Sequence, residues 1–230
     1  MKSLLRYLLL TLRNVVIFFF VSTLIMVVAF KYVPVYFTPL MFLRSVSQIK
    51  EGEWPQMAHH WVPLENISHD LPQAVMASED NLFLQHKGFD FVQIHQARID
   101  ALRGKRERGA STITQQTAKN VFLWPGHSWL RKGLEAYFTV LIEHIWGKRR
   151  IMEVYLNSIE MGRGIYGAEA VAHLHFDTDA KHLNRRQCAL IADSLPNPLE
   201  RDSGHPTAYM NKRQRQIVSL MNKIDKFPTE

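Results

Sequence analysis

The feature that most constrains this chain is an uncharged, strongly apolar run from Val15 to Phe30. Cationic residues flank the run on both sides: Lys2, Arg6 and Arg13 before it and Lys31 after it. A bilayer-spanning helix needs about 20 apolar residues, and the run approaches this length once Asn14 and the extended side chains of Arg13 and Lys31 are included. The run therefore predicts one transmembrane helix over residues 14–31.

A cleaved signal peptide is the alternative for such a run. The apolar stretch is long for a signal peptide, and no pair of small residues with the usual cleavage spacing follows it, so we favour an uncleaved anchor. Positive charge is concentrated before the run, which places residues 1–13 in the cytoplasm and the rest of the chain outside it. Residues 32–69 are then a membrane-proximal segment and linker. In this segment the apolar, proline-broken stretch 32–43 keeps the outer domain near the bilayer, and 54–64 is extended.

Composition bounds the class of the outer domain. With 230 residues and 47% hydrophobic content, the chain can bury one sizeable core, so one domain over residues 70–225 is expected. The net charge of +7 indicates an anionic partner: nucleic acid, phospholipid head groups or a phosphorylated substrate. A domain outside the cytoplasm is not expected to bind nucleic acid. The single cysteine, Cys188, excludes an internal disulfide and a thiolate metal cluster.

The pattern after residue 70 is helical, with few segments of alternating polarity. Helices are expected near 72–85, 90–103, 112–122, 129–147, 149–157, 165–175, 184–195 and 207–223. The sequence contains no dinucleotide-binding fingerprint, phosphate-binding Gly-Lys loop or spaced Cys and His zinc cluster. The expected fold is a mainly α globule.

One expected helix carries polar groups on the face turned toward the interior. In GASTITQQTAKN, from Gly109 to Asn120, the helical rotation places four side chains on one face: Thr112, Gln115, Gln116 and Lys119. Ser111 is placed to cap this helix. Amides, hydroxyls and an ammonium group are converging donors that suit an oxygen-rich, anionic ligand. A solvated surface face is the alternative.

An acidic residue interrupts the apolar stripe of the helix expected at 72–85. Glu79 lies in the middle of this stripe, which consists of Leu71, Val75, Met76, Leu82 and Phe83. Burial there raises the pKa of a carboxylate toward neutrality, which makes Glu79 a candidate general base. Alternatively, an arginine or backbone donors hold it in a structural role. His86, farther along the same face, is an acid, a base or a structural hydrogen-bonding residue.

A second carboxylate extends the apolar face of the helix expected at 129–147. Arg131 and Glu135 are four residues apart, so they can pair on one face. Further cations occur at Lys119, Lys132, Lys148–Arg150 and in the cluster Arg103–Arg108. Inward carboxylates with several cations favour transfer to a sugar hydroxyl, because a departing diphosphate needs neutralising charge rather than a proton. A glycoside hydrolase would instead need a second carboxyl group as its acid.

Five ordered motifs within residues 70–200 resemble those of the peptidoglycan glycosyltransferases, the transglycosylases of glycosyltransferase family 51. The first contains Glu79, Asp80, Phe83, His86, Gly88 and Asp90, and the second is GASTITQQTAKN. The third is RKGLE at 131–135, the fourth runs from Lys148 through Asn157 to Ala168, and the last runs from Ala189 to Pro198. No penicillin-binding transpeptidase domain fits after residue 200, so the chain most resembles the monofunctional, membrane-anchored biosynthetic member.

This resemblance implies a lysozyme-like helical fold that polymerises lipid II, the undecaprenyl-diphosphate-linked disaccharide pentapeptide, into β-1,4 glycan strands. It implies that Glu79 is the base for the acceptor 4-hydroxyl and that Glu135 is a second essential carboxylate. The implied substrate-binding residues are Ser111, Thr112, Gln115, Gln116, Lys119, Asn120, Arg131 and Lys132. The implied supporting residues are Asp80, Phe83, His86, Lys148 and Asn157.

The resemblance also implies a location and partners. Such a protein is a single-pass protein of the bacterial inner membrane, with a periplasmic catalytic domain that acts on lipid II and the growing glycan chain, alone or in a cell-wall synthesis or division complex. A divalent cation, Mg or Mn, is often associated with the family, but the sequence shows no dedicated metal cage, so the metal is treated as optional. Ala110 and His175 depart from the usual Gly and Tyr of the family, which affects packing rather than the central carboxylates.

Two alternatives stay open at this stage. The first is a membrane-anchored lytic enzyme of similar fold, which cleaves glycan; the cations at Lys119 and Arg131 argue against it, because cleavage gains little from them. The second is a non-catalytic cell-wall scaffold, and the presence of both Glu79 and Glu135 argues against it.

Overall fold

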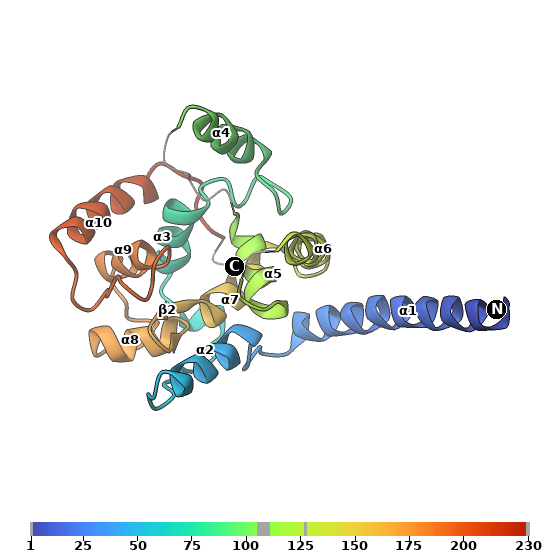
Figure 1. Ribbon diagram of the computed structural model, residues 1–230. Coiled ribbons are helices and arrows are strands. Elements are labelled where there is room, and N and C mark those ends of the chain that lie inside the picture. Colours follow the sequence, from blue (N-terminus) through green and yellow to red (C-terminus); the bar gives the residue numbers. More distant parts are fainter. Residues whose placement is uncertain (1, 105–110, 127, 229–230) are drawn as a thin grey trace.

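The structure is a computed structural model that describes residues 2–104, 111–126 and 128–228. Its first helix, α1 (Lys2–Tyr32), projects from a helical globule, with the N-terminus at its far end (Figure 1). Ser3–Tyr32 has a mean hydropathy of 2.3 and is, within these described ranges, the one helix long and apolar enough to cross a membrane. The helix begins well before residue 14, where the sequence placed its start, because leucine-rich residues 3–12 continue it without a Gly or Pro.

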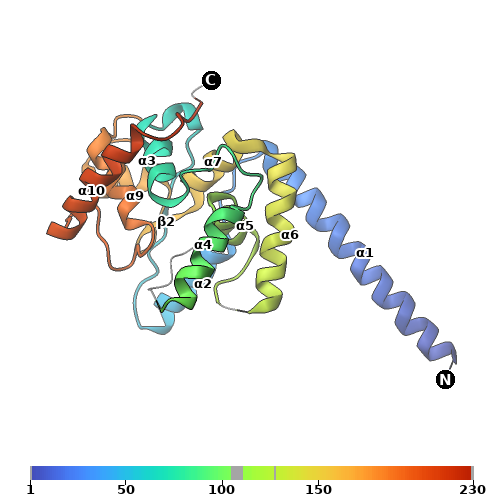
Figure 2. The ribbon, with the colours of Figure 1, turned by 90° about the horizontal axis from the view of Figure 1, so that it is seen from above.

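The C-terminal part of α1 packs against the globule. Val27 is fully buried, and its carbonyl oxygen accepts a 2.7 Å hydrogen bond from Nε1 of Trp146. One turn earlier on α1, Thr23 Oγ1 lies 2.9 Å from the Tyr137 hydroxyl. Tyr137 belongs to α6 (Trp129–Ile145), which meets α1 near the globule and diverges from it toward its own N-terminus (Figure 2).

A second helix, α2 (Pro39–Lys50), lies in the segment that the sequence described as membrane-proximal and proline-broken. Thr38 caps this helix by accepting a 3.2 Å hydrogen bond from Met41 N, and Pro39 occupies its first turn. The sequence reasoning took Pro39 for a break, whereas proline at this position starts a helix. Met41 is fully buried and α2 packs against α5 (Ile113–Phe122), so α2 is part of the globule.

All the helices expected after residue 70 are present, with shifted ends: α3 (Asp70–Glu79), α4 (Phe91–Leu102), α5, α6, α7 (Gly147–Ser158), α8 (Ala168–Phe176), α9 (Arg185–Ser194) and α10 (Ala208–Met221). The core forms where α3 packs against α9 and α10, and where α5 packs against α6 and α7. The prediction of a mainly α globule is confirmed.

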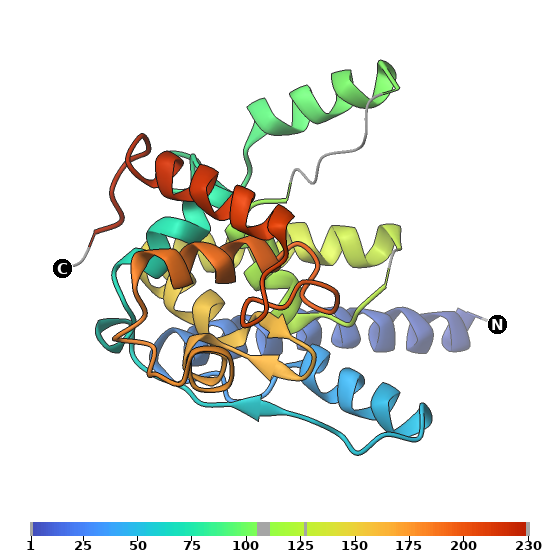
Figure 3. The same ribbon diagram turned by 90° about the vertical axis from the view of Figure 1, so that its left-hand side faces the viewer.

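A small sheet joins the segment before α3 to the chain after α7. Its order is β1 (Ala58–His59), β3 (Ile165–Tyr166) and β2 (Glu160–Gly162), with β1 parallel and β2 antiparallel to β3. Gly164, at φ +69°, makes the turn between β2 and β3, and a Cβ there would lie 2.3 Å from the carbonyl oxygen of Gln56. The sheet lies on the side of the globule that carries α2 (Figure 3). Strands this short show no alternation, so the sequence did not reveal them.

Candidate active site

Glu79 is the last residue of α3, not the middle of a longer helix as the sequence predicted. The chain turns away at Asp80, whose carboxylate accepts a 3.0 Å hydrogen bond from Ile113 N at the start of α5. Residues 81–88 form turns, so His86 does not continue the helix face of Glu79, and that prediction was wrong. Glu79 instead borders a polar cavity of about 200 Å³, together with Asp90 and Ser111.

Burial raises the pKa of Glu79, as its place in an apolar stripe predicted. A 3.0 Å hydrogen bond from Gln116 Nε2 to Glu79 Oε2 lowers this pKa, whereas the negative charge of Asp80 raises it further. The Tyr155 hydroxyl donates to Gln116 Oε1 at 3.1 Å, which leaves Nε2 for Glu79. Complete burial raises the pKa of Tyr155 well above its ordinary value, so this hydroxyl stays a neutral donor. A carboxylate with a raised pKa and an oriented amide beside it suits a general base.

Asp80 and His86 support the start of α5. His86 Nε2 lies 2.9 Å from Asp80 Oδ2, and Gly88 N donates to His86 Nδ1 at 3.1 Å. Because Nδ1 accepts, Nε2 is the nitrogen that donates to Asp80. The Asp80 carboxylate then lies at the N-terminus of α5, where the helix dipole favours negative charge. His86 therefore takes the structural role that the sequence left open.

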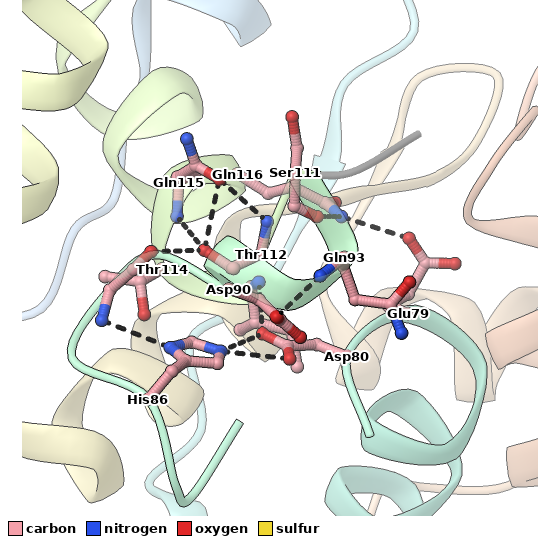
Figure 4. A network of polar contacts seen from close by, with 12 residues as sticks. Glu79, Asp80, His86, Asp90, Gln93, Ser111, Thr112, Thr114, Gln115 and Gln116 are labelled. Carbon is pink, nitrogen blue, oxygen red and sulfur yellow. Dashed lines mark hydrogen bonds and ion pairs between the residues drawn. The ribbon is translucent and has the colours of Figure 1, made fainter. Parts of the chain in front are cut away.

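Thr112 caps α5 and Ser111 does not, contrary to the sequence prediction. Thr112 Oγ1 accepts from Gln115 N at 3.2 Å, and Gln115 Oε1 accepts from Thr112 N at 3.1 Å. Gln115 lines neither cavity of the site, because its side chain completes this capping box while Gln116 points to Glu79 (Figure 4). Ser111 is exposed and lines the polar cavity beside Glu79 as well as a second, larger cavity.

The predicted cations meet in a larger cavity of about 540 Å³ that Gln116 also lines. Its polar lining includes Ser111, Gln116, Lys119, Asn120, Arg131, Lys132 and Glu135. Burial lowers the pKa of Lys119, and the charge of Glu135 opposes this shift. Asn120 Nδ2 and Arg131 Nε are buried without a hydrogen-bond partner in the described part of the chain, and both residues line this cavity. These donors suit an anionic group.

Glu135 holds two of these cations in place. Arg131 Nη1 donates to Glu135 Oε2 at 3.0 Å, as the four-residue spacing predicted, and Lys132 pairs with Oε1. Glu135 is only 3% exposed, so this ion-pair network lies in the interior. The carboxylate thereby fixes the positions of two cations in the cavity.

Phe83, Lys148 and Asn157 lie outside the linings of both cavities. Lys148 Nζ lies 4.5 Å from the ring centroid of Phe83 and 2.6 Å from Glu143 Oε1. Asn157 is fully buried and exchanges two 2.9 Å hydrogen bonds with the backbone of Val62. These residues support the walls of the site, and Asn157 attaches the segment before α3 to α7.

Part of the predicted site lies outside the described residues: the basic cluster from residue 105 onward, and Ala110. The described ranges contain no group of three or more His, Cys, Asp or Glu side chains that could hold a metal ion.

Sequence reasoning missed two charged residues near the site. Arg201, in the loop after α9, lowers the pKa of Glu79 through its charge and donates a 2.8 Å hydrogen bond to the Asp193 carbonyl oxygen. Glu160, the first residue of β2, lines the larger cavity. A loop and a three-residue strand have no periodicity, so the only signal was a carboxylate between Ile159 and Met161.

Fold and site together define a helical enzyme in which a carboxylate of raised pKa lies near a cation-lined cavity, joined to an apolar N-terminal helix. Comparison with family models gives a match to the transglycosylase family over residues 45–222. This chain belongs to the transglycosylase family, and the membership confirms the lysozyme-like helical fold that the motifs implied.

Relatives of known name agree with this assignment. A biosynthetic peptidoglycan transglycosylase of Bacteroides thetaiotaomicron is 57% identical over 99% of this chain and 90% of its own length. A protein of the same name from Bdellovibrio bacteriovorus is 52% identical over 89% of this chain and 82% of its own length. A third, from Pseudomonas fluorescens, is 49% identical over 92% of this chain and 88% of its own length.

Proposed function

We propose that this chain polymerises lipid II into the β-1,4 glycan strands of peptidoglycan and releases undecaprenyl diphosphate. The names of its relatives support glycan polymerisation in cell wall synthesis. The observation that carries the choice of substrate is the juxtaposition of a carboxylate of raised pKa, Glu79, with a cavity lined by Lys119, Arg131 and Lys132. This transfer needs a base that removes the proton of the acceptor hydroxyl and cations that neutralise the leaving diphosphate.

In the proposed reaction Glu79 removes the proton from the 4-hydroxyl of the acceptor sugar. The hydroxyl oxygen attacks the anomeric carbon of the growing chain, and the bond from that carbon to the diphosphate oxygen breaks with inversion. The leaving diphosphate keeps its electrons as charge, so it needs neighbouring cations rather than a proton. Gln116 fits this scheme because its hydrogen bond favours the ionised form of Glu79.

Lys119, Arg131 and Lys132 are the proposed diphosphate ligands, with Asn120 as a neutral donor. In this scheme Glu135 positions Arg131 and Lys132 and does not attack the sugar.

For location, we propose a single-pass protein of the inner membrane with its globule in the periplasm. Two observations support it: the apolar length of α1, and the concentration of cations at its N-terminal end. The contact of Val27 with Trp146 favours an anchor that stays with the domain over a signal peptide that is removed.

The deciding experiment incubates the purified, detergent-solubilised chain with lipid II and measures glycan polymer and undecaprenyl diphosphate together. Polymer is expected, and Glu79→Gln is expected to abolish it. Lys119→Ala is expected to lower the rate about 100-fold or more, because a preorganised charge is lost where negative charge develops. The exposed lysine Lys212 on α10 gives the matched control, Lys212→Ala, with an unchanged rate.

The same assay separates the lytic alternative. A lytic enzyme would shorten preformed glycan, make no polymer from lipid II and tolerate Lys119→Ala. Either absence of polymer from the folded protein or full activity of Lys119→Ala would contradict the proposal.

A further inference from the structure

The larger cavity holds a charged pair that has no role in the proposed reaction. Arg44 of α2 and Glu160 of β2 both line it, and Arg44 Nε donates to Glu160 Oε2 at 3.2 Å. Arg44 precedes the segment matched by the family, residues 45–222, so family membership assigns it no role. The pair joins the helix that follows the anchor to the wall of the site.

Glu160 is buried, and Arg44 is the cation that pairs with it. It lies opposite Tyr166 in the β2–β3 pair and is 4% exposed. Burial raises its pKa, and the charge of Arg44 opposes that rise. Weaker contacts from the Gly164 backbone N–H and the Tyr166 hydroxyl also oppose the rise, while the second oxygen, Oε1, has no hydrogen bond of standard geometry among the described residues. A buried carboxylate with one cationic partner is costly to keep for packing alone.

Arg44 uses only one edge of its guanidinium for this contact. In the described part of the chain its side chain makes one hydrogen bond, from Nε, so both terminal nitrogens are left for solvent or a ligand. The side chain is 39% exposed, whereas that of Glu160 is 5% exposed. Glu160 therefore orients Arg44 through Nε and leaves the two terminal nitrogens of the guanidinium free to bind a phosphate group as a fork.

The surroundings of Arg44 select the type of ligand. Leu40, one turn earlier on the same face of α2, also lines the cavity, and the opposite apolar lining comes from Leu123, Trp124, Leu195 and Pro196. Four basic residues, Arg44, Lys119, Arg131 and Lys132, face two acidic ones, Glu135 and Glu160. A cavity with an excess of positive charge and an apolar rim suits a group that joins phosphates to hydrocarbon.

We propose that Arg44 binds the diphosphate of a polyprenyl-diphosphate-linked substrate and that Glu160 is the positioning residue that orients it. This inference rests on the proposed function, since it names a further ligand of the same cavity. It also gives a function to α2 and to the small sheet, which together bring the pair into the site.

The first test measures direct binding of undecaprenyl diphosphate to the full chain in detergent micelles, by calorimetry. Arg44→Ala is expected to weaken the Kd about tenfold, the usual loss for one charged hydrogen bond. Arg44→Lys keeps the charge without the fork and should recover part of the loss. Arg163→Ala is the matched control. This exposed arginine lies between β2 and β3 and pairs with Glu51 and Glu53, so the variant should bind undecaprenyl diphosphate as the wild type does.

The second test uses lipid II turnover. Arg44→Ala should raise KM about tenfold with kcat within about twofold, and Glu160→Gln should raise KM in the same direction by a smaller factor. Because Arg44→Ala leaves Glu160 without its cation, the double variant Arg44→Met with Glu160→Gln guards against unfolding. It should show the same KM as Arg44→Ala, with a cooperative thermal transition.

Three outcomes would overturn the inference. One is wild-type affinity for undecaprenyl diphosphate in both Arg44→Ala and the double variant. Another is a raised KM for lipid II with unchanged affinity for undecaprenyl diphosphate, which would show that Arg44 contacts the disaccharide pentapeptide part of lipid II instead. The third is a loss confined to kcat and Tm. Absence of polymer from the wild type would count against the proposed function instead, while the binding measurement would still decide the role of Arg44.

Discussion

The orientation of one amide is the most consequential detail at the scale of single residues. The Tyr155 hydroxyl donates a hydrogen bond to the amide oxygen of Gln116, and the NH2 group of Gln116 is thereby directed to Glu79. The hydrogen bond stabilises the ionised form of Glu79, while burial disfavours that form and raises its pKa. The balance keeps a base that is both ionisable and desolvated.

This balance predicts the pH dependence of a glutamine variant. Polymerisation should rise with pH as Glu79 loses its proton, since the base acts when ionised. Gln116→Ala removes a group that lowers the pKa of Glu79, so the acid limb of kcat/KM should move to higher pH. The pH profile of kcat/KM for lipid II, from pH 4 to 8, measures this shift.

The neighbouring glutamine provides the control. Gln115→Ala removes the capping box and should lower stability while leaving the position of the acid limb unchanged. An acid limb that moves equally in both variants would show that Gln116 does not tune Glu79.

At the scale of the element, the start of α5 connects the two halves of the site. Thr112 caps the helix, donates a 2.7 Å hydrogen bond to the Gly88 carbonyl oxygen, and lies next to Ile113, whose N–H bonds Asp80. One helix start therefore holds the end of α3 and the turn around Gly88 in register. A shift of α5 would move Gln116 away from Glu79.

A stability measurement separates the observed cap from the predicted one. Thr112→Ala should lower the free energy of unfolding by about 1–2 kcal/mol, because the cap and the bond to Gly88 are both lost. Ser111→Ala should change it by less than about 0.5 kcal/mol, because Ser111 is exposed. Denaturant titration of both variants in the same detergent gives the comparison, and equal losses would contradict the assignment of Thr112 as the cap.

Sequence patterns predicted the long helices and the inward carboxylates because each rests on periodicity over many residues. They failed where single contacts decide the structure. The end of α3 is set by the hydrogen bond between Asp80 and Ile113 N, thirty-three residues apart. The cap of α5 was misplaced by one residue, since Ser111 and Thr112 are chemically similar. The pairing of Glu160 with Arg44 joins residues 116 apart, which no local pattern reveals.

At the scale of the whole molecule, α1 and the globule form a continuous packed structure. Arg150 donates to the Phe30 carbonyl oxygen from Nε at 3.1 Å and from Nη2 at 2.9 Å, and from Nη2 to the Val33 carbonyl oxygen at 2.5 Å. These carbonyls belong to the last turn of α1 and the residues after it, which lack helical partners. Arg150 therefore closes the end of the anchor and attaches it to α7.

Removal of this arginine should loosen the anchor. Arg150→Ala is expected to increase amide hydrogen exchange over residues 24–34 and to lower Tm, because the carbonyl groups at the end of α1 lose their donor. Arg149→Ala should leave both unchanged, since Arg149 pairs only with the exposed Glu65. Hydrogen-exchange mass spectrometry in micelles compares these adjacent residues, and equal exchange in the two variants would show that Arg150 does not hold the anchor.

The position of α2 decides where this chain can be cut and joined to another. The match to the family model starts at residue 45, yet Leu40 and Arg44 already line the cavity. A chimera joined at residue 45 would keep every family motif and lose one wall of its site. A swap of membrane anchors between relatives should therefore be made before Thr38, so that the helix it caps travels with the globule.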